Sequence, residues 1–194
     1  MNDLAEAIKE LASPMVPREG TLQTLTRRVT ERTLDRGQHL TRAGEVAVAL
    51  YFVRSGLLRY YYLSDDKEHT GQFFDNGTFV ADLSSITTGA PTQQFVEALE
   101  PSLVVSIPVA ALQEAYDADH AMERFGRRLV EAAMAGSQRR SANLLVRTPE
   151  QLYDSFVRTR PEIAGKVAQY MVASYLGITP ESLSRIRARR TSRP

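Results

Sequence analysis

The chain has 194 residues, of which 43% are hydrophobic and 24% charged, and a formal net charge of +1. This composition is typical of a globular protein with one or two domains. The absence of cysteine excludes disulfides, thiolate zinc sites and iron–sulfur clusters. No long apolar run and no signal-peptide pattern occurs, so we expect a cytoplasmic protein with no membrane partner.

The three histidines do not indicate a metal site. His39, His69 and His120 lie far apart in the sequence, without the spacing that brings two imidazoles onto one ion. Nucleophile motifs such as Gly-x-Ser-x-Gly are also absent. We therefore expect no metal, no cofactor and no catalytic residue, which leaves a cupin-like enzyme as the least favoured class.

The charge is distributed unevenly along the chain. After Val157 the sequence carries eight basic and two acidic residues, a net charge of +6, which leaves −5 for the remainder. A basic end on a mildly acidic body indicates a polyanionic partner. The alternative is a basic end that is simply solvated.

The first 110 residues predict a short helical segment followed by a β-domain. Apolar residues at helical spacing favour a helical lead-in before Val29. Seven of the eleven glycines then fall between Gly20 and Gly89, and short β-rich runs separate them. These runs cover residues 46–53, 57–63 and 72–80. The pattern predicts an antiparallel barrel or sandwich, with a hairpin tip at Asp65-Asp66-Lys67.

A long helix is predicted after Pro108, covering about residues 119–145. Apolar and small residues recur along it at spacings of three and four. They are Met122, Phe125, Leu129, Ala132 and Gly136. Such a stripe is typical of a dimer seam, and its alternative is a stripe packed on the chain's own barrel. Thr148 and Pro149 then open another helix as N-cap and first residue.

Residues 169–186 have the pattern of a helix-turn-helix. Ala173 is small enough for two helices to cross closely, and Gly177 accepts the positive φ that the turn needs. Apolar residues occupy the shared core positions. They are Val172, Leu176, Ile178, Leu183 and Ile186. Thr179 caps the second helix and Pro180 presets its first turn.

The second of these helices presents a polar face that fits the major groove of DNA. With Leu183 and Ile186 inward, Glu181, Ser182, Arg185 and Arg189 face outward. Arg185 is suited to donate two hydrogen bonds to a guanine. Glu181 is suited to accept one hydrogen bond from the amino group of a cytosine. Other arginines suit phosphates, namely Arg187, Arg190 and Arg193. The candidate DNA-binding residues are Thr179, Glu181, Ser182, Arg185, Arg187, Arg189 and Arg190. A helical hairpin with a charged, solvated surface is the alternative.

The order of these parts resembles the Crp/Fnr superfamily, named for the cyclic-AMP receptor protein. The resemblance is carried by Asp35-Arg36-Gly37, Gly44 and the segments 50–56 and 76–83, and it covers almost the whole chain. It implies an α+β fold with an antiparallel, jelly-roll-like β-roll sensor domain, a long dimerisation helix and a small helical helix-turn-helix domain. The expected boundaries are 1–117 for the N-terminal helices and cyclic-nucleotide-binding-like β-roll, 118–147 for the dimerisation helix and 148–194 for the DNA-binding domain.

The resemblance also implies a ligand pocket, in which a Gly-Glu-Leu triplet holds a ribose hydroxyl and a later arginine pair grips a cyclic phosphate. Here the triplet reads Ala81-Asp82-Leu83, and Thr92-Gln93 stands in place of the arginine pair. A buried phosphate without a cation loses its strongest bonds, so the pocket is expected to be degenerate. Asp82 capping the next turn is the alternative role. The candidate ligand residues are Ala81, Asp82, Leu83, Thr92 and Gln93, with Ser137 and Gln138 of the long helix.

Two family features are expected to be missing. The iron–sulfur sensors of the superfamily need cysteines, and the sequence leaves no room for the β-hairpin wing that usually follows the recognition helix. We therefore predict a homodimeric, sequence-specific regulator of transcription that binds double-stranded DNA and is not a canonical cyclic-AMP responder. Its small-molecule effector is left open. The alternative is a stand-alone small-molecule sensing module that acts on a protein partner.

Overall fold

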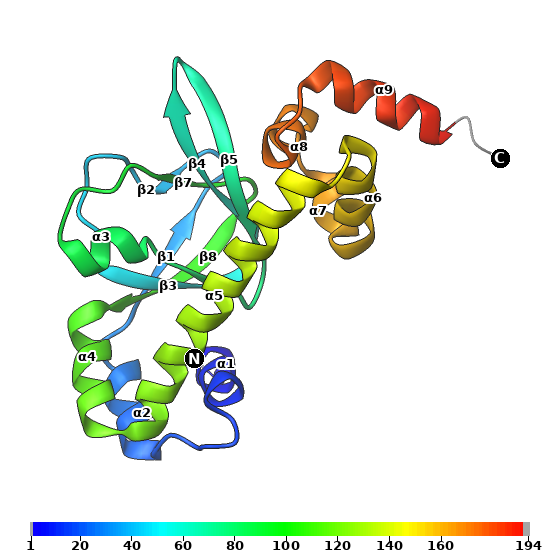
Figure 1. Cartoon of the computed structure of the whole chain (residues 1–194). Coiled ribbons are helices and arrows are strands. Elements are labelled where there is room, and N and C mark those ends of the chain that lie inside the picture. The colour runs from blue at the N-terminus through cyan, green and yellow to red at the C-terminus, as the bar shows by residue number, and fades with distance from the viewer. Residues whose placement is uncertain (1, 192–194) are drawn as a thin grey trace. The chain divides into compact units, whose positions relative to one another are not determined.

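The computed structural model describes residues 2–191 and confirms the α+β fold (Figure 1). The strands are β1 (Thr30–Leu34), β2 (His39–Thr41), β3 (Ala49–Ser55), β4 (Leu58–Ser64), β5 (Lys67–Phe74), β6 (Phe79–Val80), β7 (Phe95–Ala98) and β8 (Ser102–Pro108). They form two four-stranded sheets, in the orders β1-β8-β3-β6 and β2-β7-β4-β5. In the first sheet β8 pairs antiparallel with both β1 and β3, with Val105 opposite Glu31 and Phe52. This is the expected jelly-roll-like β-roll.

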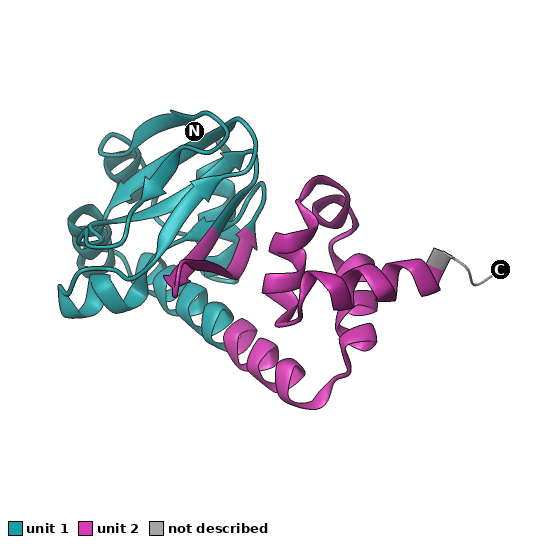
Figure 2. Ribbon diagram, turned by 90° about the horizontal axis from the view of Figure 1, so that it is seen from above, with its two compact units in different colours: residues 1–59, 74–134 teal, residues 60–73, 135–194 magenta. Residues whose placement is uncertain are grey.

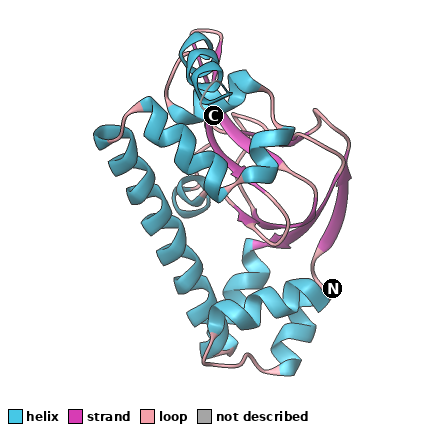
Figure 3. Ribbon diagram, turned by 90° about the vertical axis from the view of Figure 1, so that its right-hand side faces the viewer, coloured by secondary structure: helices cyan, strands magenta, loops and turns pink. Residues whose placement is uncertain are grey.

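Along the chain, the helices fall before, within and after the roll, and Figure 3 shows them in cyan with the strands in magenta. They are α1 (Asn2–Ala12), α2 (Glu19–Thr26), α3 (Leu83–Thr88), α4 (Val109–Ala118), α5 (His120–Val146), α6 (Pro149–Thr159), α7 (Pro161–Lys166), α8 (Gln169–Leu176) and α9 (Pro180–Thr191). The long helix α5 agrees with the predicted range to within one residue at each end. The short helices α3 and α7 were not predicted, because each has only six residues and too little apolar periodicity to detect. In the part of the chain that the structure describes, no helix is both long and apolar enough to cross a membrane.

Two of the predicted β-rich runs, 46–53 and 72–80, differ clearly from the observed strands β3, β5 and β6. Residues 46–48 precede β3 as a loop, because the Ala47 amide donates to the Ser85 hydroxyl at 2.9 Å instead of joining a strand ladder. The run 72–80 is divided between β5 and β6 by a turn at Gly77, whose φ is +80°. Positive φ is readily adopted only by glycine, so this residue interrupts an otherwise β-rich run.

The chain divides into two compact units that alternate along the sequence (Figure 2). Unit 1 comprises residues 1–59 and 74–134, and unit 2 comprises residues 60–73 and 135–194. The core of unit 1 joins α1 and α2 to β3, β8, α4 and the first turns of α5. Its fully buried members include Leu4, Ile8, Val105, Ile107, Met122 and Phe125.

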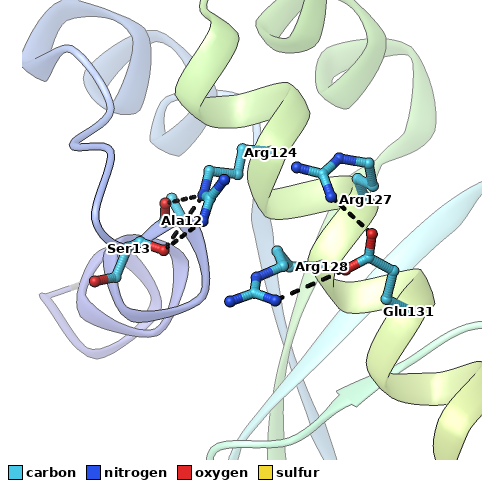
Figure 4. A network of polar contacts seen from close by, with 6 residues as sticks. All are labelled: Ala12, Ser13, Arg124, Arg127, Arg128 and Glu131. Carbon is cyan, nitrogen blue, oxygen red and sulfur yellow. Dashed lines mark hydrogen bonds and ion pairs between the residues drawn. The ribbon is translucent and has the colours of Figure 1, made fainter.

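The first half of α5 is anchored in unit 1, so the first residues of the predicted seam pack on the chain's own core and not on a partner helix. Met122 and Phe125 have no exposed surface, and Leu129 packs against the same core. Arg124 Nε donates to the carbonyl oxygen of Ala12 at 2.8 Å (Figure 4). The stripe that begins at Met122 therefore packs on the chain's own fold over these turns, and burial there uses up the apolar area that a partner helix would need.

Asp119 fixes the start of α5. Its side chain is 5% exposed and accepts hydrogen bonds from the amides of Arg18 at 2.6 Å and Ala121 at 3.0 Å. Burial alone disfavours the charged carboxylate, but these bonds outweigh it, and the pKa of Asp119 lies below its ordinary value. One ionised carboxylate thus ties the loop before α2 to the N-terminus of α5.

Unit 2 combines the tip of the β4–β5 hairpin with the C-terminal helices. Asp65 and Asp66 have φ of +51° and +57°, as a two-residue hairpin turn requires, which confirms the predicted tip. The Thr70 amide donates to the Ser174 hydroxyl at 2.9 Å. The ring of Phe73 lies 5.2 Å from that of Tyr175, between centroids. Phe156 completes this aromatic cluster at 5.4 Å from Tyr175.

Candidate nucleic-acid interface and ligand pocket

The helix-turn-helix is formed by α8 and α9, as predicted. Ala173 is completely buried where the helices approach each other, and Gly177 ends α8 with a φ of +69°. Val172, Leu176, Leu183 and Ile186 are buried in the shared core, whereas Ile178 is half-buried. The Ser182 amide donates to the Thr179 hydroxyl at 3.2 Å, which is the expected N-cap.

The first turns of α9 present Glu181 and Arg185 to solvent. Arg185 Nε donates to the Glu181 carbonyl at 3.4 Å, so its guanidinium stays close to the helix start. The pKa of Glu181 is held below its ordinary value, first by its own amide, then by the Thr179 hydroxyl and by the charge of Arg185. Glu181 is therefore an anion at neutral pH and accepts, rather than donates, hydrogen bonds. Ser182 is half-buried and lies 3.1 Å from Thr179, between hydroxyl oxygens.

The later arginines of α9 lie near acidic residues of α6. Arg189 Nη1 is 3.5 Å from Glu150 Oε1, and Arg190 Nη1 is 3.3 Å from Asp154 Oδ1. Both pairs are exposed, and exposed pairs contribute about 0 to 1 kcal/mol, so they hold the two arginines only weakly. Arg187 is exposed. Arg193 lies outside the described residues.

In the β-roll, two of the predicted ligand residues, Asp82 and Thr92, lie together and form a hydrogen bond with each other. The Thr92 hydroxyl donates to the Asp82 carboxylate in a short hydrogen bond, and Thr92 is only 3% exposed. Asp82 also accepts from the Ser85 amide at 3.1 Å, which makes it the N-cap of α3. Ala81 is half-buried, whereas Leu83 and Gln93 are exposed. Asp82 therefore has the local capping role that was the alternative at the level of sequence.

Ser137 and Gln138 lie on α5 in unit 2, and both are exposed. The other five ligand candidates belong to unit 1.

A second stripe on α5 carries exposed apolar residues that sequence reasoning missed. Val130 and Met134 are 45% and 61% exposed, and Leu145 is 85% exposed. With Ser137 and Ser141 they follow spacings of four, three, four and four residues. The stripe lies roughly 130° around the helix from Met122 and Phe125, which is more than a third of a turn. The signal was present in the spacing, but the more apolar buried stripe concealed it.

Comparison with known proteins finds one matching family model and several similar regulators. Residues 31–119 match the model of the cyclic nucleotide-binding domain family. The chain is also 25% identical to the fumarate and nitrate reduction regulatory protein of Vibrio cholerae, over 94% of this chain and 78% of that protein. Together these matches support a transcription regulator of the Crp/Fnr type. DNA binding follows from that assignment.

Solved structures of Crp/Fnr regulators share the fold of this one. FixK2 from Bradyrhizobium japonicum superposes with a TM-score of 0.73 at 20% identity, over 83% of each chain. The c-di-GMP responsive global regulator CLP of Xanthomonas campestris superposes with a TM-score of 0.69 at 18% identity, over 90% of this chain and 92% of that one. At these identities the likeness concerns the fold alone.

Proposed function

We propose that this Crp/Fnr regulator acts as a homodimer that binds DNA sequence-specifically and does not respond to cyclic AMP through the β-roll. The observation that carries the second part is the bond between Thr92 and Asp82. At the position where the family resemblance places a cation for the cyclic phosphate, the chain has a buried hydroxyl that is engaged by a carboxylate. A phosphate placed there meets negative charge and finds no arginine among these residues, which is unfavourable in a buried setting.

The proposed reading of DNA rests on the start of α9. Glu181 and Arg185 are exposed one turn apart, close to the helix N-terminus, where recognition helices contact base edges. Arg185 reads guanine, and Glu181 accepts from cytosine. Thr179 and Ser182 bind backbone phosphate or bases beside them. Arg187, Arg189 and Arg190 bind phosphates and supply affinity that does not depend on sequence.

The proposed dimer contact is the second stripe of α5, centred on Val130 and Met134. Large apolar side chains this exposed are favourably buried against a partner. The spacing of four and three residues is that of two packed helices. A pair of α5 helices would then hold two copies of α9 for half-sites about 34 Å apart.

The experiment is thermal unfolding with millimolar cyclic AMP or cyclic GMP. A ligand that binds only the folded chain raises Tm, so the expected result for the unmodified chain is no shift. Thr92→Arg is the matched variant, because it removes the hydroxyl bond to Asp82 and adds the missing cation. A clear rise in Tm for the unmodified chain would refute the degenerate pocket.

DNA binding is measured in the same preparations at two salt concentrations. Contacts to several phosphates predict a steep loss of affinity between about 50 and about 200 mM salt. A chain that binds no DNA at either concentration would instead support the sensing module that acts on a protein partner.

A further inference from the structure

A pocket of about 290 Å³ lies within unit 2, separate from the β-roll site. Its walls come from the second half of α5, from α6, from the end of α8 and from Gln72 of β5. Four arginines line it, namely Arg139, Arg140, Arg147 and Arg160. None of its lining residues is acidic. The pocket therefore carries four formal positive charges around one small volume.

These charges are not neutralised within unit 2. Among residues 2–191, no carboxylate forms an ion pair with any of the four guanidinium groups. The contrast with α9 is informative, since Arg189 and Arg190 there lie within 3.5 Å of a carboxylate oxygen. Cations gathered around one cavity repel one another, and a bound anion relieves that repulsion.

Two of the arginines are already positioned by neutral groups. Arg140 Cζ lies 4.2 Å from the centroid of the Tyr175 ring, and its Nη2 donates to the Thr70 carbonyl at 3.4 Å. Arg160 Nη1 donates to the Phe73 carbonyl at 3.0 Å and to Gln72 Oε1 at 3.3 Å. These partners orient the side chains without cancelling their charge. Pre-organisation of this kind lowers the entropic cost of binding.

The geometry points to a binding site for a small phosphorylated anion. We propose that this pocket of unit 2 binds such a ligand through its four arginines. The planar guanidinium fork matches the oxygens of a phosphoryl group and forms two parallel hydrogen bonds to it. A volume of about 290 Å³ is at the lower end of ligand pockets, which span roughly 300 to 1,000 Å³. It suits one or two phosphoryl groups on a small organic body.

The position of the pocket gives the ligand a means of acting on the DNA-binding helices. Tyr175 and Leu176 of the pocket wall belong to α8, whereas Arg139 and Arg140 belong to α5. An anion held by both helices stiffens their connection. This regulatory consequence rests on the proposed DNA-binding function, but anion binding itself does not.

The test is titration calorimetry of the full chain with inorganic pyrophosphate, at low ionic strength and against sodium chloride of matched ionic strength. The test variant is Arg139→Gln with Arg147→Gln, since both side chains are exposed and can be changed without disturbing the fold. The control is Arg36→Gln, an exposed arginine of unit 1. We expect saturable binding of pyrophosphate by the unmodified chain and the control. Each lost guanidinium is expected to weaken it by roughly tenfold.

Three results would overturn the proposal. They are no heat of binding in the unmodified chain, the same affinity in the double variant, and an equal loss in Arg36→Gln. The phosphates of DNA are the other anions that these four arginines can bind. Affinity for random-sequence DNA is therefore measured in the absence of pyrophosphate. The proposal expects the double variant to keep that affinity, whereas a parallel loss would assign the pocket to DNA. Failure of the chain to bind any DNA would contradict the proposed function and leave the calorimetric result standing.

Discussion

At the residue scale, the partners of individual side chains decide what each one is able to bind. Asp82 caps α3 and accepts from Thr92, so it is already occupied within its own loop. Arg185 donates to a backbone carbonyl of its own helix at 3.4 Å. Arg190, in contrast, forms an ion pair with Asp154. The two arginines of α9 therefore differ in the partner that their guanidinium groups have in the free protein.

This difference predicts separate effects on DNA binding. Arg185→Ala is expected to cost about 1 to 3 kcal/mol on the preferred operator and little on random DNA, because a bidentate base contact discriminates between sequences. Arg190→Ala is expected to weaken both by similar amounts and to reduce the salt slope by about one. Binding isotherms on both DNAs over a salt series measure this. Equal losses for Arg185→Ala on the two DNAs would make it a phosphate contact.

Asp119 predicts a pH dependence of stability. Because its pKa is lowered in the folded chain, its contribution is complete above its unfolded pKa, near 4, and is lost as pH falls through the folded value. Asp119→Asn accepts through one oxygen only and is expected to cost about 1 to 3 kcal/mol at neutral pH. Denaturant unfolding from pH 7 to pH 3 measures the difference between the two chains. It should shrink below about pH 4, and a difference that is constant throughout would contradict the assignment.

At the element scale, α5 shows how one helix carries two apolar stripes with different roles. Its range was predictable from periodicity alone. The partner that buries each face of α5 was not predictable. A spacing of three and four residues indicates an apolar face but does not identify what packs against it. Met122 and Phe125 fill the core of unit 1, and the exposed stripe at Val130 and Met134 was hidden by that stronger pattern.

Placing one aspartate in each stripe is predicted to have different effects on the oligomeric mass. Met134→Asp is expected to halve the mass seen by light scattering, because two carboxylates would face each other across the proposed seam without partners. Ala132→Asp is the matched control, since Ala132 is exposed and belongs to the stripe first predicted. Leu129→Asp is expected to lower Tm, because Leu129 packs on the core of unit 1. Dissociation by Ala132→Asp and not by Met134→Asp would return the seam to the first stripe.

At the scale of the whole molecule, the order of parts was predictable and their grouping was not. Local rules placed the helix-turn-helix, since Ala173, Gly177 and Thr179 each serve a requirement of the motif itself. The joining of residues 60–73 to the C-terminal helices depends on contacts about 100 residues apart, such as that between Thr70 and Ser174. No periodicity encodes such a contact, and the arginine pocket, which includes Gln72, was missed for the same reason.

The membership of the β4–β5 hairpin in unit 2 has a consequence for protein engineering. A chimera that takes only residues 135–194 leaves the rings of Phe156 and Tyr175 without Phe73, which is 1% exposed in its native setting. Apolar surface would then face water, and the graft would be prone to aggregation. Residues 135–194 are therefore not expected to be transferable on their own. A working exchange between regulators needs crossover points near residues 60 and 73 as well as one within α5.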